Sequence, residues 1–111
     1  MTYTINTLSA STDGQPIEIT GITLGAANTV HTAGASNLDE VYIFATNTTA
    51  SPITVTTLFG GVAATDAIVN TINANSSKMI VQGAPLQNSK VAKVYASAVG
   101  INVYGKAGTI S

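Results

Sequence analysis

The chain lacks cysteine, tryptophan and arginine, and only 8% of its 111 residues are charged. Without cysteine it has no disulfide framework, no cysteine-ligated zinc or iron–sulfur centre and no thiol nucleophile. Four lysines and five acids give a formal net charge of −1, which excludes the basic surface of nucleic-acid-binding proteins and a polybasic membrane patch. We therefore expect no nucleic-acid partner, no membrane partner and no cofactor.

Small and β-branched residues take the place of charge. The sequence contains 17 Thr, 16 Ala, 11 Ile and 10 Val, with 10 Gly, 9 Ser and 9 Asn to supply turns. Because charge repulsion protects such a chain poorly against self-association, we expect much of its apolar surface to meet another protein. The alternative is that Ala and Thr side chains give an innocuous neutral surface.

The length and the hydrophobic pattern favour one all-β domain. A chain of 11.2 kDa should fold to an accessible surface of roughly 5,700 Å² and bury about two-thirds of its unfolded surface. The helical period is almost absent, and strand-length runs follow each other with turn residues between them. The sequence predicts a single-domain antiparallel β-sandwich over residues 1–111, Ig-like or jelly-roll, with eight or nine strands.

Two pairs of runs have the pattern of hairpins. Residues 40–47 place Val41, Ile43 and Ala45 on one face, with rather apolar residues on the other, which indicates a central strand. A turn leads to a second strand over residues 53–59, so we predict a hairpin there. A second hairpin is predicted from residues 91–99 and 101–104, across Gly100.

The other runs are weaker signals. A phase slip at Gly21 predicts a β-bulge, and residues 63–71 fit either a short helix or a strand. Residues 76–82 predict a strand with Met79 and Val81 inward. Residues 83–85 should break that strand, since they contain glycine and proline. The densest apolar runs are too short to cross a membrane, and the first five residues have no signal-peptide pattern.

The chain offers little chemistry for catalysis. Its one histidine, His31, cannot make a histidine-rich metal site, and the nearest carboxylates in sequence belong to Asp39 and Glu40. These two acids are adjacent, so on a strand they point to opposite faces and do not form a facing pair. We expect no catalytic, cofactor-binding or metal-binding residues. We interpret His31 as a hydrogen-bonded residue at a strand end or subunit contact.

Charge is distributed unevenly along the sequence. All four lysines lie in the last third, whereas four of the five acids lie in the first 40 residues. This polarity fits a head-to-tail contact between copies. Equally, Lys78 and Lys93 could guard edge strands against aggregation.

The N-terminal run stands apart from the predicted hairpins. It either pairs within its own sheet or extends to a neighbouring copy, so residues 1–12 are a candidate intersubunit arm. The candidate intersubunit contacts are Tyr3, Ile5, Lys93, Tyr95 and Tyr104.

One block of the sequence resembles a known family. Asp39-Glu-Val-Tyr-Ile-Phe-Ala-Thr-Asn-Thr-Thr-Ala-Ser-Pro-Ile-Thr-Val-Thr-Thr-Leu-Phe-Gly-Gly is similar to a pattern in small virion proteins of tailed phages. There, an acid opens an aromatic-rich strand, and a polar turn leads to a second strand that ends in Gly-Gly. Val30-His31-Thr32-Ala33 and Pro85-Leu86 also fit, so the resemblance spans roughly residues 16–104.

The resemblance implies a phage head decoration (cement) protein. Such a protein is an all-β module that assembles as an oligomer, often a homotrimer, on the outer capsid and bridges neighbouring subunits of the major capsid protein. It would be made in the host cytoplasm, act on the virion surface and carry no catalytic residues. Three alternatives stay open: a tail-tube, head–tail connector or fibre-base protein; a carbohydrate-binding β-sandwich; and, least favoured, an enzyme.

Overall fold

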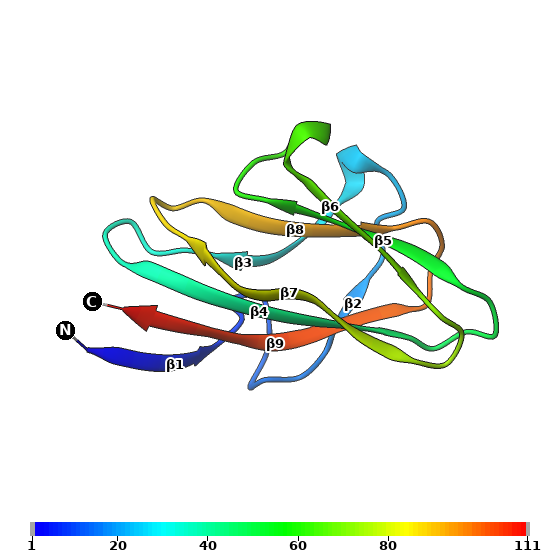
Figure 1. Ribbon diagram of the computed structural model, residues 1–111, viewed down its shortest axis with the longest axis horizontal. Helices are drawn as coiled ribbons and strands as arrows, with labels where there is room; N and C mark the ends of the chain where they lie inside the picture. The colour runs from blue at the N-terminus through cyan, green and yellow to red at the C-terminus, as the bar shows by residue number, and fades with distance from the viewer. Residues whose placement is uncertain (1, 111) are drawn as a thin grey trace.

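Two antiparallel sheets pack face to face in the computed structural model, which describes residues 2–110 (Figure 1). The first sheet has the strand order β1-β9-β4-β7, and β2 also pairs with β9. Its strands are β1 (Tyr3–Thr7), β2 (Ile17–Ile19), β4 (Leu38–Asn47), β7 (Ser77–Leu86) and β9 (Ile101–Ile110). The second sheet has the order β3-β8-β5-β6. Its strands are β3 (Asn28–Thr32), β5 (Ile53–Phe59), β6 (Ala67–Ile72) and β8 (Val91–Ala96).

The strand order is that of a jelly roll. Strands pair from the ends of the chain inward: β2 with β9, β3 with β8, β4 with β7 and β5 with β6. Successive pairs fall in alternate sheets, as in one long hairpin rolled onto itself. An Ig fold would instead keep its first two strands as neighbours in one sheet. The predicted all-β sandwich is therefore confirmed, and the jelly-roll form is the one observed.

Both predicted hairpins are wrong. Strands β4 and β5 lie in different sheets, and so do β8 and β9. The links between them cross the roughly 10 Å between the sheets. Asn47 holds the first link: its amide nitrogen donates to the carbonyls of Ser51 and Ile72. Local alternation is the same for a hairpin and for a crossing, so the pattern alone did not separate them.

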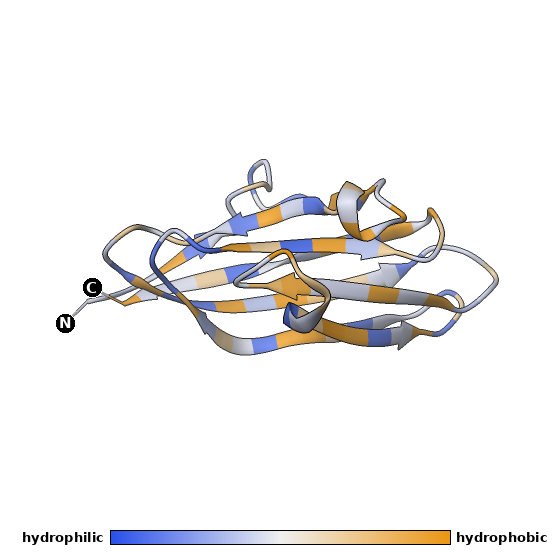
Figure 2. Cartoon of the chain, turned by 90° about the horizontal axis from the view of Figure 1, so that it is seen from above, coloured by the Kyte–Doolittle hydropathy of each residue, from blue (hydrophilic) through white to orange (hydrophobic). Residues whose placement is uncertain are grey.

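Alternation along β4 and β9 builds the core. Val41, Ile43 and Ala45 are completely buried, as are Ile101 and Val103 on β9. The side chains between them on both strands are half-buried or exposed on the opposite face, and Figure 2 shows this alternation along the strands. β4 is a central strand, as predicted, and pairs with β9 over ten residues. The accessible surface is 5663 Å², in agreement with the expected area.

Strand β7 departs from its prediction because of two bulges. The register shifts between Ile43 and Phe44, so Ile80 is an extra residue and Met79 points outward while Val81 is buried. A second shift falls at Gly83, which adopts a φ of 66°. The bulge lets the strand continue through Pro85 to Leu86, where a break was predicted. Proline is tolerated there because β7 is an edge strand.

Two further segments are settled by the structure. Residues 63–71, which fitted helix or strand, form the short 3-10 turn η2 (Ala64–Asp66) followed by β6. The predicted bulge at Gly21 is wrong, since β2 ends at Ile19 and the chain leaves the sheet for the turn η1 (Leu24–Ala26). Gly21 lies against the carbonyl of Ala26, where a Cβ would come within 2.0 Å of the oxygen. Only glycine fits this crossing.

We expect Thr57→Val to stabilise the fold. Thr57 is completely buried, and its Oγ1 has no hydrogen-bond partner among the described residues. Removing an unsatisfied buried hydroxyl should raise the free energy of unfolding by about 1 kcal/mol, or the melting temperature by about 4 °C. The reverse change on the same strand, Val55→Thr, buries a new hydroxyl and should be destabilising. Thermal and denaturant unfolding measure both, and a destabilised Thr57→Val would contradict this reading.

Candidate functional site

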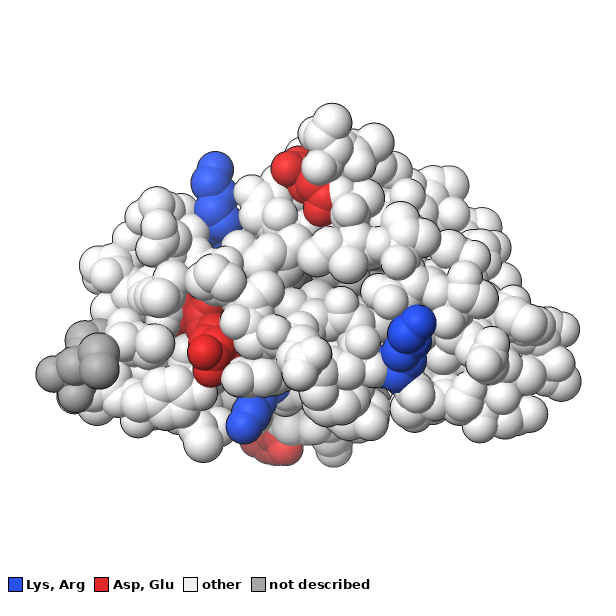
Figure 3. Space-filling view, viewed as in Figure 1, with Lys and Arg blue, Asp and Glu red and all other residues white. Residues whose placement is uncertain are grey.

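The outer face of the first sheet carries four of the six aromatic side chains, of which Tyr3 is exposed and the other three are half-buried. We define this outer face by the residues that β1, β9, β4 and β7 present to solvent. Its principal members are Tyr3, Ile5, Glu40, Tyr42, Phe44, Met79, Tyr104 and Lys106. The strands pair in register, so these side chains form one continuous surface across the sheet. Figure 3 shows that most of the surface turned to the viewer is uncharged.

A single carboxylate joins β1 to β4, across β9, on the outer face. The hydroxyl groups of Tyr3 on β1 and Tyr42 on β4 both donate to Glu40 Oε1, at 3.1 and 3.0 Å. Tyr3 reaches across β9 because Gly108 has no side chain: a Cβ there would lie 2.1 Å from the tyrosine hydroxyl. Lys106 Nζ lies 5.1 Å from the centroid of the Tyr42 ring, a cation–π contact. The cluster fixes the N-terminal strand to the centre of the sheet.

The remaining rings of the outer face are stacked on each other. The centroids of Phe44 and Tyr104 are 5.2 Å apart, and their planes are within 10° of parallel. Two rings lying flat and side by side could not approach this closely, so they overlap face to face. The Tyr42 ring is covered by Lys106 and lies over Gly83. Several ring faces are thus occupied by neighbours within the sheet.

This arrangement suits a protein partner better than a sugar. A sugar-binding platform needs open aromatic faces, whereas Phe44 and Tyr104 stack on each other and Lys106 covers the Tyr42 ring. The side chains are held by their neighbours before any partner arrives, so binding would freeze few rotamers. A pre-ordered surface rich in aromatic side chains is typical of a protein–protein interface core.

A polar network centred on the buried residues His31 and Asp39 lies beside the N-terminal strand. Asp39 Oδ2 is 2.7 Å from His31 Nε2, and Thr109 Oγ1 donates to Asp39 Oδ1 at 2.9 Å. The backbone N–H of Ser9 donates to His31 Nδ1 at 3.0 Å, which assigns the ring hydrogen to Nε2. Asn6 on β1 donates in turn to Thr109. The network links β1, β3, β4 and β9 and spans both sheets.

This network has a structural role in the geometry observed. Both ring nitrogens of His31 are engaged, and its Nδ1 accepts from a backbone amide rather than from a serine hydroxyl. Ser9 Oγ accepts from the N–H of Thr32 at 2.7 Å instead. The prediction of a hydrogen-bonded His31 is confirmed. Its carboxylate partner is Asp39, one of the two acids nearest in sequence.

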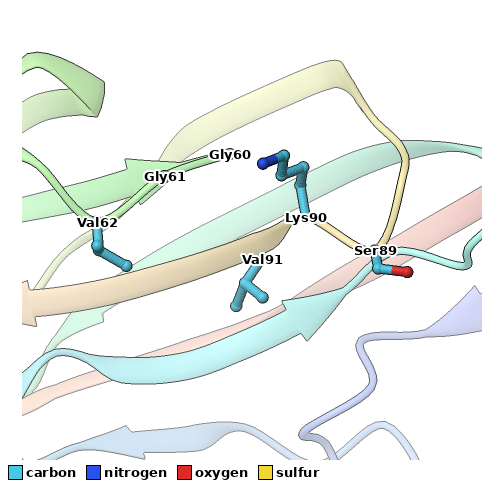
Figure 4. A pocket seen from close by; sticks show the side chains of 6 residues that line it. All are labelled: Gly60, Gly61, Val62, Ser89, Lys90 and Val91. Carbon is cyan, nitrogen blue, oxygen red and sulfur yellow. The ribbon is translucent and has the colours of Figure 1, made fainter.

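Other features of the surface offer little to a small ligand. A shallow hollow of about 190 Å³ is lined by Gly60, Gly61, Val62, Ser89, Lys90 and Val91 (Figure 4). Typical ligand pockets are larger, at about 300–1,000 Å³, and hold several converging polar groups. Within residues 2–110 no cluster of three or more metal-ligating side chains occurs. No helix in that range is long and apolar enough to cross a membrane.

The candidate contacts predicted from the sequence fall on two opposite faces. Tyr3, Ile5 and Tyr104 belong to the outer face of the first sheet. Lys93 and Tyr95 lie half-buried on β8, on the far side of the second sheet. β8 is an interior strand of that sheet, so Lys93 does not guard an edge. Lys78, on the edge strand β7, does occupy a guarding position.

Sequence reasoning missed the centre of the outer face. Glu40, Tyr42, Phe44 and Lys106 were not selected as contact residues, although three of them lie on one predicted strand. The signal was present in the alternation: Glu40, Tyr42 and Phe44 share the face opposite Val41 and Ile43. Their partners Tyr3 and Lys106 lie far away in sequence and became visible only with the β1–β9–β4 pairing.

Comparison with known proteins found no matching family model, no matching curated protein and no matching solved structure. Any relation to phage decoration proteins depends on the residue pattern within roughly residues 16–104, chiefly over residues 39–61.

We expect the Glu40 cluster to weaken at alkaline pH. Partial burial and the hydrogen bond to Glu40 raise the pKa of Tyr3 above 10.0, and the same hydrogen bond, with partial burial and the carboxylate charge, raises the pKa of Tyr42. The unfolded chain then loses these protons at lower pH than the folded chain. The stabilisation is complete below about pH 10 and is lost as pH rises through the raised values.

Spectrophotometric titration of the tyrosines tests this expectation. Glu40→Gln should shift part of the titration to lower pH, because it removes the negative charge beside both phenols. Glu18→Gln, the same change on β2 of the same sheet, should leave the curve unchanged. Identical curves for the wild type and Glu40→Gln would show that the cluster does not exist in solution.

Proposed function

We propose that this chain is a structural virion protein that decorates and reinforces a phage capsid by binding across subunits of the major capsid protein. In this role it works as a homo-oligomer on the outer capsid surface, and a homotrimer is the form that the resemblance implies. It needs no cofactor and performs no catalysis.

The outer face of the first sheet carries this proposal. Three strands of ten residues and one of five, spaced about 4.8 Å apart, cover roughly 550 Å². This is about two-thirds of the ~800 Å² that each partner buries in a standard protein interface. The surface is aromatic and held by its own contacts, and tyrosines engage both of its principal charged groups, Glu40 and Lys106. Such a surface suits binding to many identical copies of one rigid partner.

The fold and the family-like block support the same role. Jelly rolls are frequent among viral capsid and lectin domains, which is support by analogy. The block that resembles decoration proteins, residues 39–61, forms most of β4, the crossing link and β5. Two of its aromatic residues, Tyr42 and Phe44, lie on the outer face. The residues that carry the resemblance thus include residues that would contact a shell.

The copy number of the chain in purified virions of its source tests the proposal. Quantitative mass spectrometry against the major capsid protein should give a number of the same order as that protein. A handful of copies per particle would instead favour a tail, connector or fibre-base protein. Absence from the particles would overturn a structural virion role.

A substitution on the outer face tests which surface binds. Met79 is 36% exposed beside Phe44, so Met79→Lys should fold normally while placing a charge in the contact. We expect it to reduce occupancy on particles that lack the native protein by at least ten-fold, because a charge desolvated without a partner is costly. Val62→Lys, in a loop of the second sheet, should bind like the wild type. Equal binding by both variants would exclude this face.

A further inference from the structure

Two edge strands of this molecule have no protection against pairing with another chain. β1 and β6 are each paired on one side only among the described residues. Neither strand contains a charged residue or a proline. Each presents a strongly exposed β-branched side chain, Ile5 at 63% and Val69 at 62%. Exposed, uncharged edges of this kind are templates for strand addition.

The other edge strands are guarded. β2 has only three residues and carries the charged side chain of Glu18. β7 carries Lys78, Pro85 and two bulges. The edge of β3 is interrupted by a bulge and covered by the segment that follows β1. In that cover, Ala10 N–H donates to the carbonyl of Val30 at 3.1 Å, and Thr32 N–H donates to Ser9 Oγ at 2.7 Å. The contrast within one molecule marks β1 and β6 as the edges that remain available.

The unguarded edges lie on opposite sides of the sandwich. β1 is the first strand in the order of the first sheet, whereas β6 is the last strand of the second sheet and contacts β7. Figure 1 shows β1 beside the C-terminal end of β9, away from β6. A pair of complementary edges on opposite sides is the geometry of a head-to-tail contact between identical copies.

We propose that β6 of one copy pairs with β1 of the next, which joins the two sheets into one continuous sheet across the joint. The two strands match in length, with six and five residues. No like charges oppose each other, since both strands are uncharged. The proposal concerns the isolated chain and holds whether or not the protein belongs to a virion.

Each joint is small. Five paired residues span about 17 Å, and the contact buries less than the ~800 Å² per partner of a standard interface. A single joint should therefore be weak, and closure of a ring or attachment to a common support would strengthen it through multiple contacts. The assembly should appear in sedimentation velocity as a mass that rises with protein concentration toward the millimolar range.

A complementation experiment distinguishes this joint from symmetric pairing. Ile5→Lys blocks β1 and leaves β6 free, whereas Val69→Lys blocks β6 and leaves β1 free. Each variant alone should be monomeric at every concentration. A 1:1 mixture should form a dimer and stop there, because the two remaining edges of that dimer are both blocked. Val99→Lys, at a 66% exposed position in the link between β8 and β9, should assemble like the wild type.

The other outcomes overturn the proposal. If Ile5→Lys alone still dimerises, β6 pairs with itself; if Val69→Lys alone does, β1 pairs with itself. If the wild-type chain stays monomeric up to millimolar concentration, neither the head-to-tail joint nor symmetric pairing of these strands occurs. Circular dichroism and melting curves show whether each variant is folded.

Cross-linking provides a second readout with minimal change to the strands. The chain has no cysteine, so Ile5→Cys and Val69→Cys each introduce a single thiol. Oxidising their mixture should give the mixed disulfide in at least ten-fold excess over either symmetric product. Val99→Cys in place of either variant measures random collision. A statistical mixture of products would contradict the head-to-tail joint.

Discussion

The ten-residue ladder between β4 and β9 is the element on which the rest of this structure depends. Its inner face contributes Val41, Ile43, Ala45 and Val103 to the core. Its outer face carries the Glu40 cluster and the Phe44–Tyr104 stack. The far side of β9 also provides the edge on which both β1 and β2 pair. One pairing register therefore determines the core, the aromatic surface and the attachment of the N-terminal strand.

Side-chain hydrogen bonds, more than burial of its own residues, attach the N-terminal strand to the sheet. Every residue of β1 is exposed, yet the strand is held at one end by Tyr3 on Glu40 and near the other by Asn6 on Thr109. Leu8, the residue that follows β1, is completely buried. The region proposed from the sequence as an arm, residues 1–12, therefore contains a core anchor as well as an exposed strand. Any removal of the arm that preserves the fold should end at Thr7.

The sequence predicted individual strands better than it predicted their partners. The inward residues of β4 and its central position were correct because alternation over eight residues is a local property. The two hairpins were wrong because sheet membership depends on contacts across the whole chain. Met79 was assigned to the core because a single extra residue, Ile80, reverses the direction of the side chains before it. Bulges of this kind have no strong local signature when glycine is absent.

The candidate site shows the same limit. Asp39 and Glu40 were correctly expected to point to opposite faces, and each proves to organise a different network. Their partners could not be read from the sequence, since Tyr3 lies 37 residues from Glu40 and Thr109 lies 70 residues from Asp39. Composition led us to expect self-association, and the pairing of β1, β9 and β4 brings together the outer face that we propose as the binding surface.

An electron cryomicroscopy reconstruction of the source virion tests the central claim, that the outer face of the first sheet is the working surface, most directly. We expect sandwich-shaped densities, each about 45 Å long, grouped as an oligomer at regular sites on the capsid shell. Tyr42, Phe44 and Tyr104 should lie against the shell, and the loops that contain η1 and η2 should point to solvent. A density with these loops on the shell and the aromatic face exposed would contradict the account, as would a shell without such density.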